Sequence, residues 1–173
     1  YDISPLARDS VRALAAETGE SAFLSARRGD ETVCLLREEG SFPIRSFVLA
    51  EGVRFPLGVA SAGLVILSML PDATVDRYLA GTDLVALYGP SHAPEPLRHR
   101  IAATRATGYA VNPGLVVEGS FGMGAAIFDA AGQPAWALSL TGVESRFGTE
   151  RRAELGRLLL EHAHRVSRRL ADR

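Results

Sequence analysis

The sequence predicts an α+β domain in which a central antiparallel sheet carries helices on its faces. Strand-like segments stand near both ends of the chain and helical segments fill the middle, so strands and helices do not alternate. The last segment has the apolar stripe of a long terminal helix. With 173 residues, the chain suits a single domain, residues 1–173.

Composition narrows the class of protein. Hydrophobic residues make up 47% of the chain, which is enough for a core and too much for a disordered segment. The formal net charge of −1 is unlike the basic balance of a nucleic-acid binder. Cys34 is the single cysteine, so no disulfide can form within the chain, which fits a reducing cytoplasm. The sequence shows no membrane span or signal peptide, and its start at Tyr1 leads us to expect a fragment.

The first third of the chain predicts a helix and three strands. Residues 4–18 have an apolar face, a serine and a proline at the start, and a glycine directly after the end. Residues 21–28 and 32–38 are expected to form a hairpin, and 44–49 a third strand. A loop with glycine and proline is expected at 51–58.

The middle of the chain predicts three helices. Residues 60–70 are followed by a proline, and residues 72–81 begin with an aspartate that can act as a cap. A loop is expected at 89–96, before a third helix at 97–108 that ends in glycine. A further strand is expected from 109–111 onward.

The last third predicts a hairpin at 122–142 and a helix from about Thr149. The apolar stripe of that helix consists of Leu155, Leu158, Leu159, His162, Val166 and Leu170. A hairpin turn at 130–133 gives the two strands faces of very different size. The large face pairs Met123 with Leu140, Ala125 with Leu138 and Ile127 with Trp136. The bare face pairs Gly122 with Thr141, Gly124 with Ser139, Ala126 with Ala137 and Phe128 with Ala135.

A bare sheet face either lets a helix approach closely or leaves a cavity. The hydroxyls of Ser139 and Thr141 would need hydrogen-bond partners there, which a small polar ligand could supply. A helix could equally fill the space, with both hydroxyls bonded to backbone. The sequence leaves both interpretations open.

The segment FPLGVASAGLVILSML passes from a loop into a helix through small residues. Free N–H groups at such a helix start can bind a carboxylate without a cationic side chain. The residues Gly58, Ala60, Ser61, Ala62 and Gly63 would let a ligand approach the backbone. Alternatively, they only pack the helix against the sheet.

These stretches resemble the effector-binding domain of the IclR family of bacterial transcription regulators. RFPLGVASAGLVILSMLP is similar to the family's loop-then-helix segment, and GYAVNPGLVVEGSFGMGAAIFDAAGQPAWALSLTG to its hairpin region. The order of elements agrees over essentially the whole chain. The resemblance implies a GAF-like fold, a small organic acid as effector, and a homodimer or homotetramer. It also implies an N-terminal winged helix-turn-helix for DNA binding, which this chain lacks.

The resemblance implies which residues bind the effector. Ser61 and Ala62 match the loop amides that hold a ligand carboxylate, and Asn112 matches a polar pocket position. The pocket-lining positions on the hairpin are matched by Gly122, Ser139 and Thr141. The sequence departs from the family at Gly58, where His is common, at Leu64, where Lys is common, at Asn112, where some members have a carboxylate, and at Gly122, where some members have a larger side chain. These departures suggest a roomier, less charged pocket and a larger or more apolar acid, such as an aromatic one.

The remaining residues indicate no catalysis, no cofactor and no metal site. The histidines have no metal-ligand spacing, and Cys34 has no evident base beside it. Ser139 lacks a nucleophile-elbow context, and GMG at 122–124 is not a phosphate loop. The prediction is therefore a sensing domain. An enzyme acting on a small carboxylic acid and a pure oligomerisation module stay as alternatives.

Overall fold

A six-stranded antiparallel sheet forms the centre of the molecule, with the strand order β3-β2-β1-β6-β5-β4. The structure is a computed structural model that describes residues 2–44 and 49–173. The strands are β1 (Ser21–Arg28), β2 (Glu31–Glu38), β3 (Arg54–Pro56), β4 (Tyr109–Pro113), β5 (Ser120–Phe128) and β6 (Pro134–Val143). The helices are α1 (Ser4–Thr18), α2 (Ser61–Ser68), α3 (Asp72–Ala80), α4 (Val85–Tyr88), α5 (Pro94–Thr107) and α6 (Thr149–Ala171). This arrangement confirms the α+β class and the long terminal helix.

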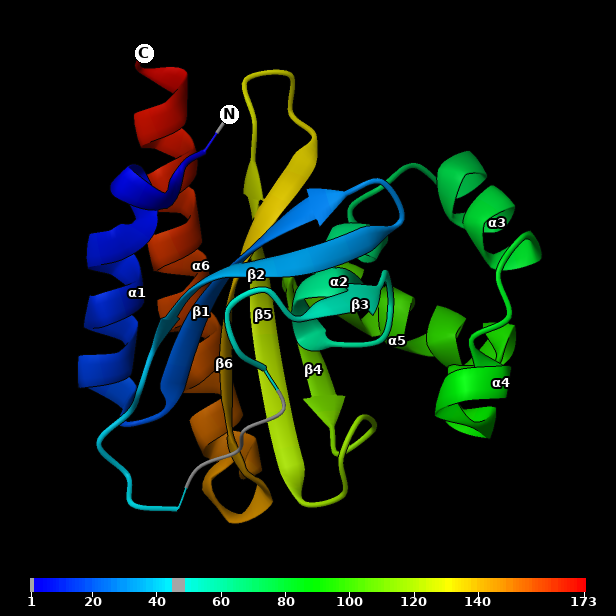
Figure 1. Ribbon diagram of the computed structural model, residues 1–173, viewed down its shortest axis with the longest axis horizontal. Coiled ribbons are helices and arrows are strands. Elements are labelled where there is room, and N and C mark those ends of the chain that lie inside the picture. Colours follow the sequence, from blue (N-terminus) through cyan, green and yellow to red (C-terminus); the bar gives the residue numbers. More distant parts are fainter. Residues whose placement is uncertain (1, 45–48) are drawn as a thin grey trace.

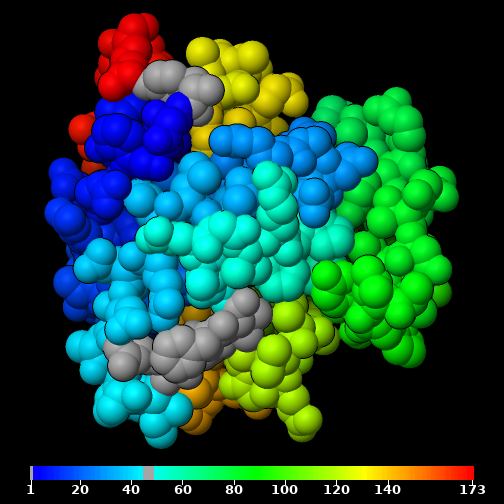
Figure 2. All heavy atoms as spheres, in the orientation of Figure 1, coloured from blue at the N-terminus to red at the C-terminus, as the bar shows by residue number. Residues whose placement is uncertain are grey.

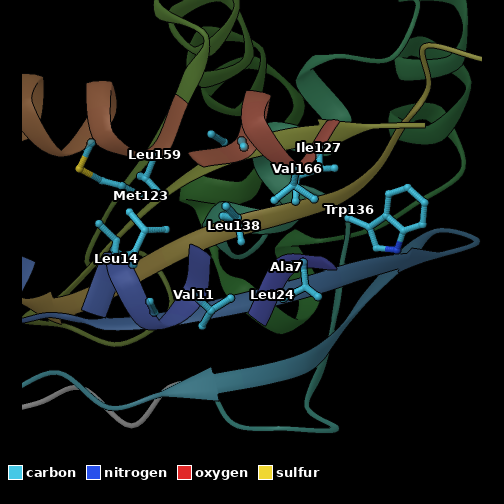
Figure 3. Packing of buried hydrophobic residues seen from close by; sticks show 14 of the residues in the cluster. Ala7, Val11, Leu14, Leu24, Met123, Ile127, Trp136, Leu138, Leu159 and Val166 are labelled. Carbon is cyan, nitrogen blue, oxygen red and sulfur yellow. The ribbon is translucent and has the colours of Figure 1, made fainter. Parts of the chain in front are cut away.

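The face of the sheet with large side chains is covered by α1 and α6, which lie side by side (Figure 1). Figure 3 shows Met123, Leu138 and Ile127 of the sheet packed together with residues of both helices. The helices contribute, among others, Val11, Leu14, Leu159 and Val166 to this core. The contrast between the two faces of the hairpin thus decides where this pair of helices packs.

The opposite face of the sheet is covered by α2, with α5 beside it. Ala110, Ala126 and Ala137 of the sheet join the second core, which is built mainly from the apolar side chains of α2 and its surroundings. Helices α3 and α4 stand to one side of the sheet, and the space-filling view shows them as a separate green mass (Figure 2).

The predicted register of the central hairpin is confirmed for six of its seven pairs, from Gly122 with Thr141 to Ile127 with Trp136. Phe128, however, pairs with Pro134 and not with Ala135, because the register shifts after Ile127. Asp129 organises the turn: its Oδ1 accepts hydrogen bonds from two backbone N–H groups of the turn, each at 2.9 Å.

The predicted elements differ from the observed ones mainly where an element is short. The expected loop 51–58 contains β3, and the expected loop 89–96 contains a single 3-10 turn and the start of α5 at Pro94. Proline suits a first helical turn, so α5 begins three residues earlier than the expected 97–108. The four-residue α4 was not predicted. The expected strand 44–49 falls mostly outside the described residues.

Among the described residues, no helix is both long enough and apolar enough to cross a membrane.

Candidate functional site

The start of α2 lies directly on the bare face of the sheet. A Cβ added at Gly122 would be 3.1 Å from the Ser61 Oγ, and one added at Gly124 would be 3.1 Å from the Ser61 carbonyl oxygen. Both distances are tighter than ordinary contacts between a Cβ and its neighbours. The two glycines of β5 therefore allow the helix to approach, as the close-packing interpretation of the sequence expected.

A small cavity nevertheless remains beside the first residue of α2. Its volume is about 30 Å³, which is room for about two water-sized groups. It is lined by Leu49, Phe55, Ala60, Ser61, Asn112, Val116, Ser120, Gly122 and Thr141. None of these residues is charged, so the polar contacts available to a ligand come from neutral side chains and from backbone.

The helix start supplies hydrogen-bond donors to this cavity. Ala60 is the N-cap residue of α2, and it cannot accept a bond from the first N–H groups through its side chain. The first turn of α2 also contains no acidic residue. The positive end of the helix dipole and the N–H groups of the first turn therefore lack a protein anion beside them. This environment favours a negatively charged group over a cation.

Asn112 closes the polar side of the cavity and holds two loops in place. Its Nδ2 donates a hydrogen bond of 2.9 Å to the Val59 carbonyl, and its Oδ1 accepts one of 3.2 Å from the Leu115 N–H. Its side chain is only 7% exposed. These bonds already use one donor and one acceptor of the amide, so Asn112 fixes the loop before α2 and has limited capacity for a ligand.

Two hydroxyls on the bare face lack hydrogen-bond partners. Thr141 Oγ1 and Ser139 Oγ are both buried and without a partner among the described residues. Thr141 lines the cavity, while Ser139 is completely buried beside Gly124, its partner on β5, and does not line it. A buried hydroxyl without a partner costs free energy in the folded state. A ligand oxygen in the cavity would remove that cost at Thr141.

The structure thus brings four of the six predicted site residues together around one cavity: Ser61, Asn112, Gly122 and Thr141. Ala62 follows Ser61 in the first turn of α2 and is buried, but it does not line the cavity. Gly63 packs instead against the loop that precedes the helix, because a Cβ there would lie 3.1 Å from the Gly58 nitrogen.

The sequence analysis missed several residues of the lining. Ser120 lies two positions before Gly122 on the same strand, so the alternation of side chains along β5 could have identified it. Phe55 is on the three-residue β3, which has too few residues for a recognisable alternation. Leu49 and Val116 lie outside helices and strands, and no local pattern marks them.

The cavity is smaller than the departures from the family pattern suggested. Gly122 was expected to make the pocket roomier, but Ser61 of α2 occupies the space that a side chain would take there. A volume of about 30 Å³ has room for little more than a carboxylate group.

Residues typical of catalysis do not gather at this cavity. Burial raises the pKa of the Cys34 thiol to about 12, which keeps it protonated and unreactive. In the described ranges, no group of three or more His, Cys, Asp and Glu side chains could hold a metal ion.

Comparison with known proteins identifies the family of this chain. Residues 1–168 match the family model described as "Bacterial transcriptional regulator IclR C-terminal". The HTH-type transcriptional regulator KipR of Bacillus subtilis is 30% identical over 170 residues, which are 98% of this chain and 68% of KipR. The HTH-type transcriptional repressor AllR of Klebsiella pneumoniae is 26% identical over 167 residues, which are 96% of this chain and 61% of AllR.

Solved structures of regulators of this family have the same fold. The crystal structure of Thermotoga maritima IclR has a TM-score of 0.90 at 28% identity, covering 99% of this chain and 69% of that one. The C-terminal domain of the Escherichia coli regulator KdgR has a TM-score of 0.83 at 23% identity, covering 99% of each chain, and shows the same fold. The relatives are named as regulators or repressors of transcription, and not as enzymes. The chain therefore belongs to the IclR family of bacterial transcriptional regulators and corresponds to the C-terminal domain of that family.

Proposed function

We propose that this domain senses a short organic acid, whose carboxylate binds in the cavity between the start of α2 and the bare face of β5 and β6. The observation that carries this proposal is the unpartnered hydroxyl of Thr141, which faces an uncharged cavity at an uncapped helix start. The carboxylate would accept hydrogen bonds from the N–H groups at Ser61 and Ala62 and from that hydroxyl. Ser139 would support the site from beneath the cavity.

The regulatory step follows from the position of the cavity. A ligand between α2 and the sheet stabilises only those arrangements of the domain in which both surfaces stay in register. We infer that a winged helix-turn-helix upstream of residue 1 responds to this shift in population, in a cytoplasmic homodimer or homotetramer. The chain spans 68% of KipR and 61% of AllR, both named as HTH-type proteins, which leaves length in such relatives for a DNA-binding part.

The substitution Thr141→Val tests this proposal, because valine keeps the shape and removes only the hydroxyl. The ligand panel consists of acetate, pyruvate, succinate and benzoate, and the measurements are thermal shift and calorimetry. A ligand at 100 times its Kd raises the stability by about 2.7 kcal/mol. We expect one or more short acids to produce such a shift, and Thr141→Val to weaken their binding about tenfold.

The stability of the unliganded domain shows whether Thr141→Val affects ligand binding or folding. Since the Thr141 hydroxyl has no partner, its removal should leave the unliganded stability unchanged or higher. Thr74→Val on α3, which does not line the cavity, serves as the matched control and should leave the affinity unchanged. Equal affinity in wild type and Thr141→Val, or no shift with any acid, would contradict the proposal.

A further inference from the structure

A second and much larger hollow lies where α5, β4 and α6 meet. Its volume is about 500 Å³, and it shares no lining residue with the cavity at α2. It is lined by Arg100, Ala103, Thr104, Thr107, Tyr109, Val111, Pro113, Thr149, Arg152 and Ala153. We refer to these ten residues as the β4 groove. Two of them are cations and none is acidic, so the groove has a positive charge of its own.

Both guanidinium groups in the β4 groove carry buried N–H groups without partners. Arg100 Nη2 and Arg152 Nε are shielded from solvent and form no hydrogen bond among the described residues. Within that part of the chain, neither side chain forms an ion pair with a carboxylate, whereas seven other arginines do. Burial also lowers the pKa of Arg100, because desolvation penalises its charge. Buried donors of this kind are costly unless an acceptor reaches the groove.

Arg152 makes two contacts at one wall of the groove. Its Nη2 donates a hydrogen bond of 3.2 Å to the Thr149 Oγ1, and its guanidinium carbon lies 5.6 Å from the centre of the Phe121 ring. Thr149 is the first residue of α6, and the N-cap Gly148 has no side chain to cap that helix. The positive end of this 23-residue helix therefore lies beside Arg152, although Glu150 in the first turn offsets part of its charge.

The rest of the β4 groove is uncharged, with three threonines and five residues that present mainly apolar surface. Tyr109 and Val111 project from β4 toward α6, and the Tyr109 ring fills the notch left by Gly156, where an added Cβ would collide with the ring. Pro113 and the small side chains Ala103 and Ala153 complete this wall. An occupant would therefore meet cationic donors at one part of its surface and aliphatic or aromatic carbon at another.

We propose that the β4 groove is a second binding site, which takes a small organic carboxylate with an apolar body. The carboxylate would lie between Arg100 and Arg152, which share its charge through charge-assisted hydrogen bonds, and the body would contact Tyr109 and Val111. Charge complementarity and concavity favour a small anion over a flat protein surface here. Pro113 at the end of β4 also removes an N–H that an added strand from a second copy would need.

This second site is linked to the first one through a single strand. Side chains alternate along β4, so Val111 and Pro113 line the β4 groove while Asn112 between them lines the cavity at α2. Asn112 in turn holds the loop before α2 through the Val59 carbonyl. A ligand in the β4 groove that shifts β4 would therefore change the geometry of the effector cavity, and the reverse also holds.

Benzoate and acetate are suitable probes, since they share the carboxylate and differ in the apolar body. We would titrate each into the isotope-labelled chain and follow the backbone amide signals by NMR. We expect benzoate to shift the signals of residues 103–111 and 149–153, and to bind more tightly than acetate. Arg152→Gln and, separately, Arg100→Gln should weaken benzoate binding about tenfold.

The chain offers matched controls on the same helices. Arg157 on α6 pairs with Glu161 and Arg98 on α5 pairs with Asp76, both at the surface, so Arg157→Gln and Arg98→Gln should leave benzoate binding unchanged. Circular dichroism spectra show whether each variant is folded. Where Arg100→Gln does not fold, Arg152→Gln alone decides the question.

Three results would overturn the proposal. The first is the absence of benzoate-induced shifts at residues 103–111 and 149–153. The second is unchanged benzoate affinity in folded Arg152→Gln. The third is a change of sedimentation coefficient in that variant without any loss of affinity, which would make the β4 groove a contact between copies. Signals of residues 59–62 and of Thr141 report on the effector cavity, so failure there is distinguished from failure in the groove.

Discussion

At the scale of single residues, the bare face of the sheet has two uses that the sequence could not separate. Gly122 and Gly124 let α2 approach the sheet. Thr141 presents a hydroxyl without a partner to the cavity at the start of α2. The alternation along the strands predicted correctly that these residues share a face. It could not predict the position of α2 on that face, because this position depends on the packing of α2 against residues distant in the sequence.

The close approach at Gly124 leads to a prediction on stability. In Gly124→Ala the added Cβ would lie 3.1 Å from the Ser61 carbonyl oxygen and 3.4 Å from the Leu138 carbonyl oxygen. Both are backbone atoms, so the start of α2 has to shift, at a cost of about 1–3 kcal/mol. Urea unfolding measures this loss. Gly81→Ala is the control, because the added Cβ there makes only an ordinary contact of 3.5 Å with the Arg77 carbonyl oxygen, and similar losses in both variants would refute the packing argument.

At the scale of elements, the best predictions are those with local signals. Helix α1 was predicted with the bounds that the structure shows, since a proline and a glycine mark its two ends. The strands β1 and β2 and the helix α3 agree to within one residue. In contrast, β3 depends on three pairs with β2 that no local pattern reveals.

A buried ionic cluster joins elements from the two ends of the chain. Glu20 follows α1 and is 2% exposed, and its Oε2 accepts hydrogen bonds from Arg146 at 2.7 Å and from Arg151 at 2.5 Å. Both arginines also donate to the Thr18 carbonyl. The partners are 126 and 131 positions away from Glu20, so the sequence alone could not identify the cluster.

Removal of the charge at Glu20 is expected to be strongly destabilising. Glu20→Gln leaves Arg146 and Arg151 partly buried without a counter-ion, which should cost about 3 kcal/mol. Glu161→Gln breaks an exposed pair with Arg157 one helical turn away and should cost only about 0.5 kcal/mol. Chemical unfolding of the two variants provides the comparison. A loss of less than 1 kcal/mol in Glu20→Gln would show that the cluster is not a significant source of stability.

At the scale of the whole molecule, we expect stability to be highest over a middle pH range and to fall at acid and at alkaline pH for different reasons. Burial lowers the pKa of His92 from 6.5, so the unfolded chain takes up the proton first and stability falls as the pH drops below about 6.5. Burial raises the pKa of Cys34 from 9.0 and of Tyr78 from 10.0, each to about 12. Both groups bind protons more tightly when folded, so stability is lost as the pH rises from 9 toward 12.

Denaturant unfolding at a series of pH values tests this profile. The variant Cys34→Ala should lose part of the alkaline dependence and keep the acid one, whereas His92→Gln should do the opposite. His99→Gln, at an exposed position of α5, is the control and should follow the wild type. An alkaline edge of the same steepness in Cys34→Ala would contradict the assignment to that thiol.

The sheet also separates the molecule into two compartments. Helix α2 and the cavity at its start lie on one side, and α1 lies on the other with α6, whose Arg169 donates a hydrogen bond of 2.9 Å to the Leu6 carbonyl. In Figure 1 the beginning of α1 and the last turns of α6 lie close together, in agreement with this bond. On the proposed function, the sheet separates a ligand in this cavity from α1. Both sides share the strands, so we expect the signal to pass as a change in the twist or tilt of the sheet.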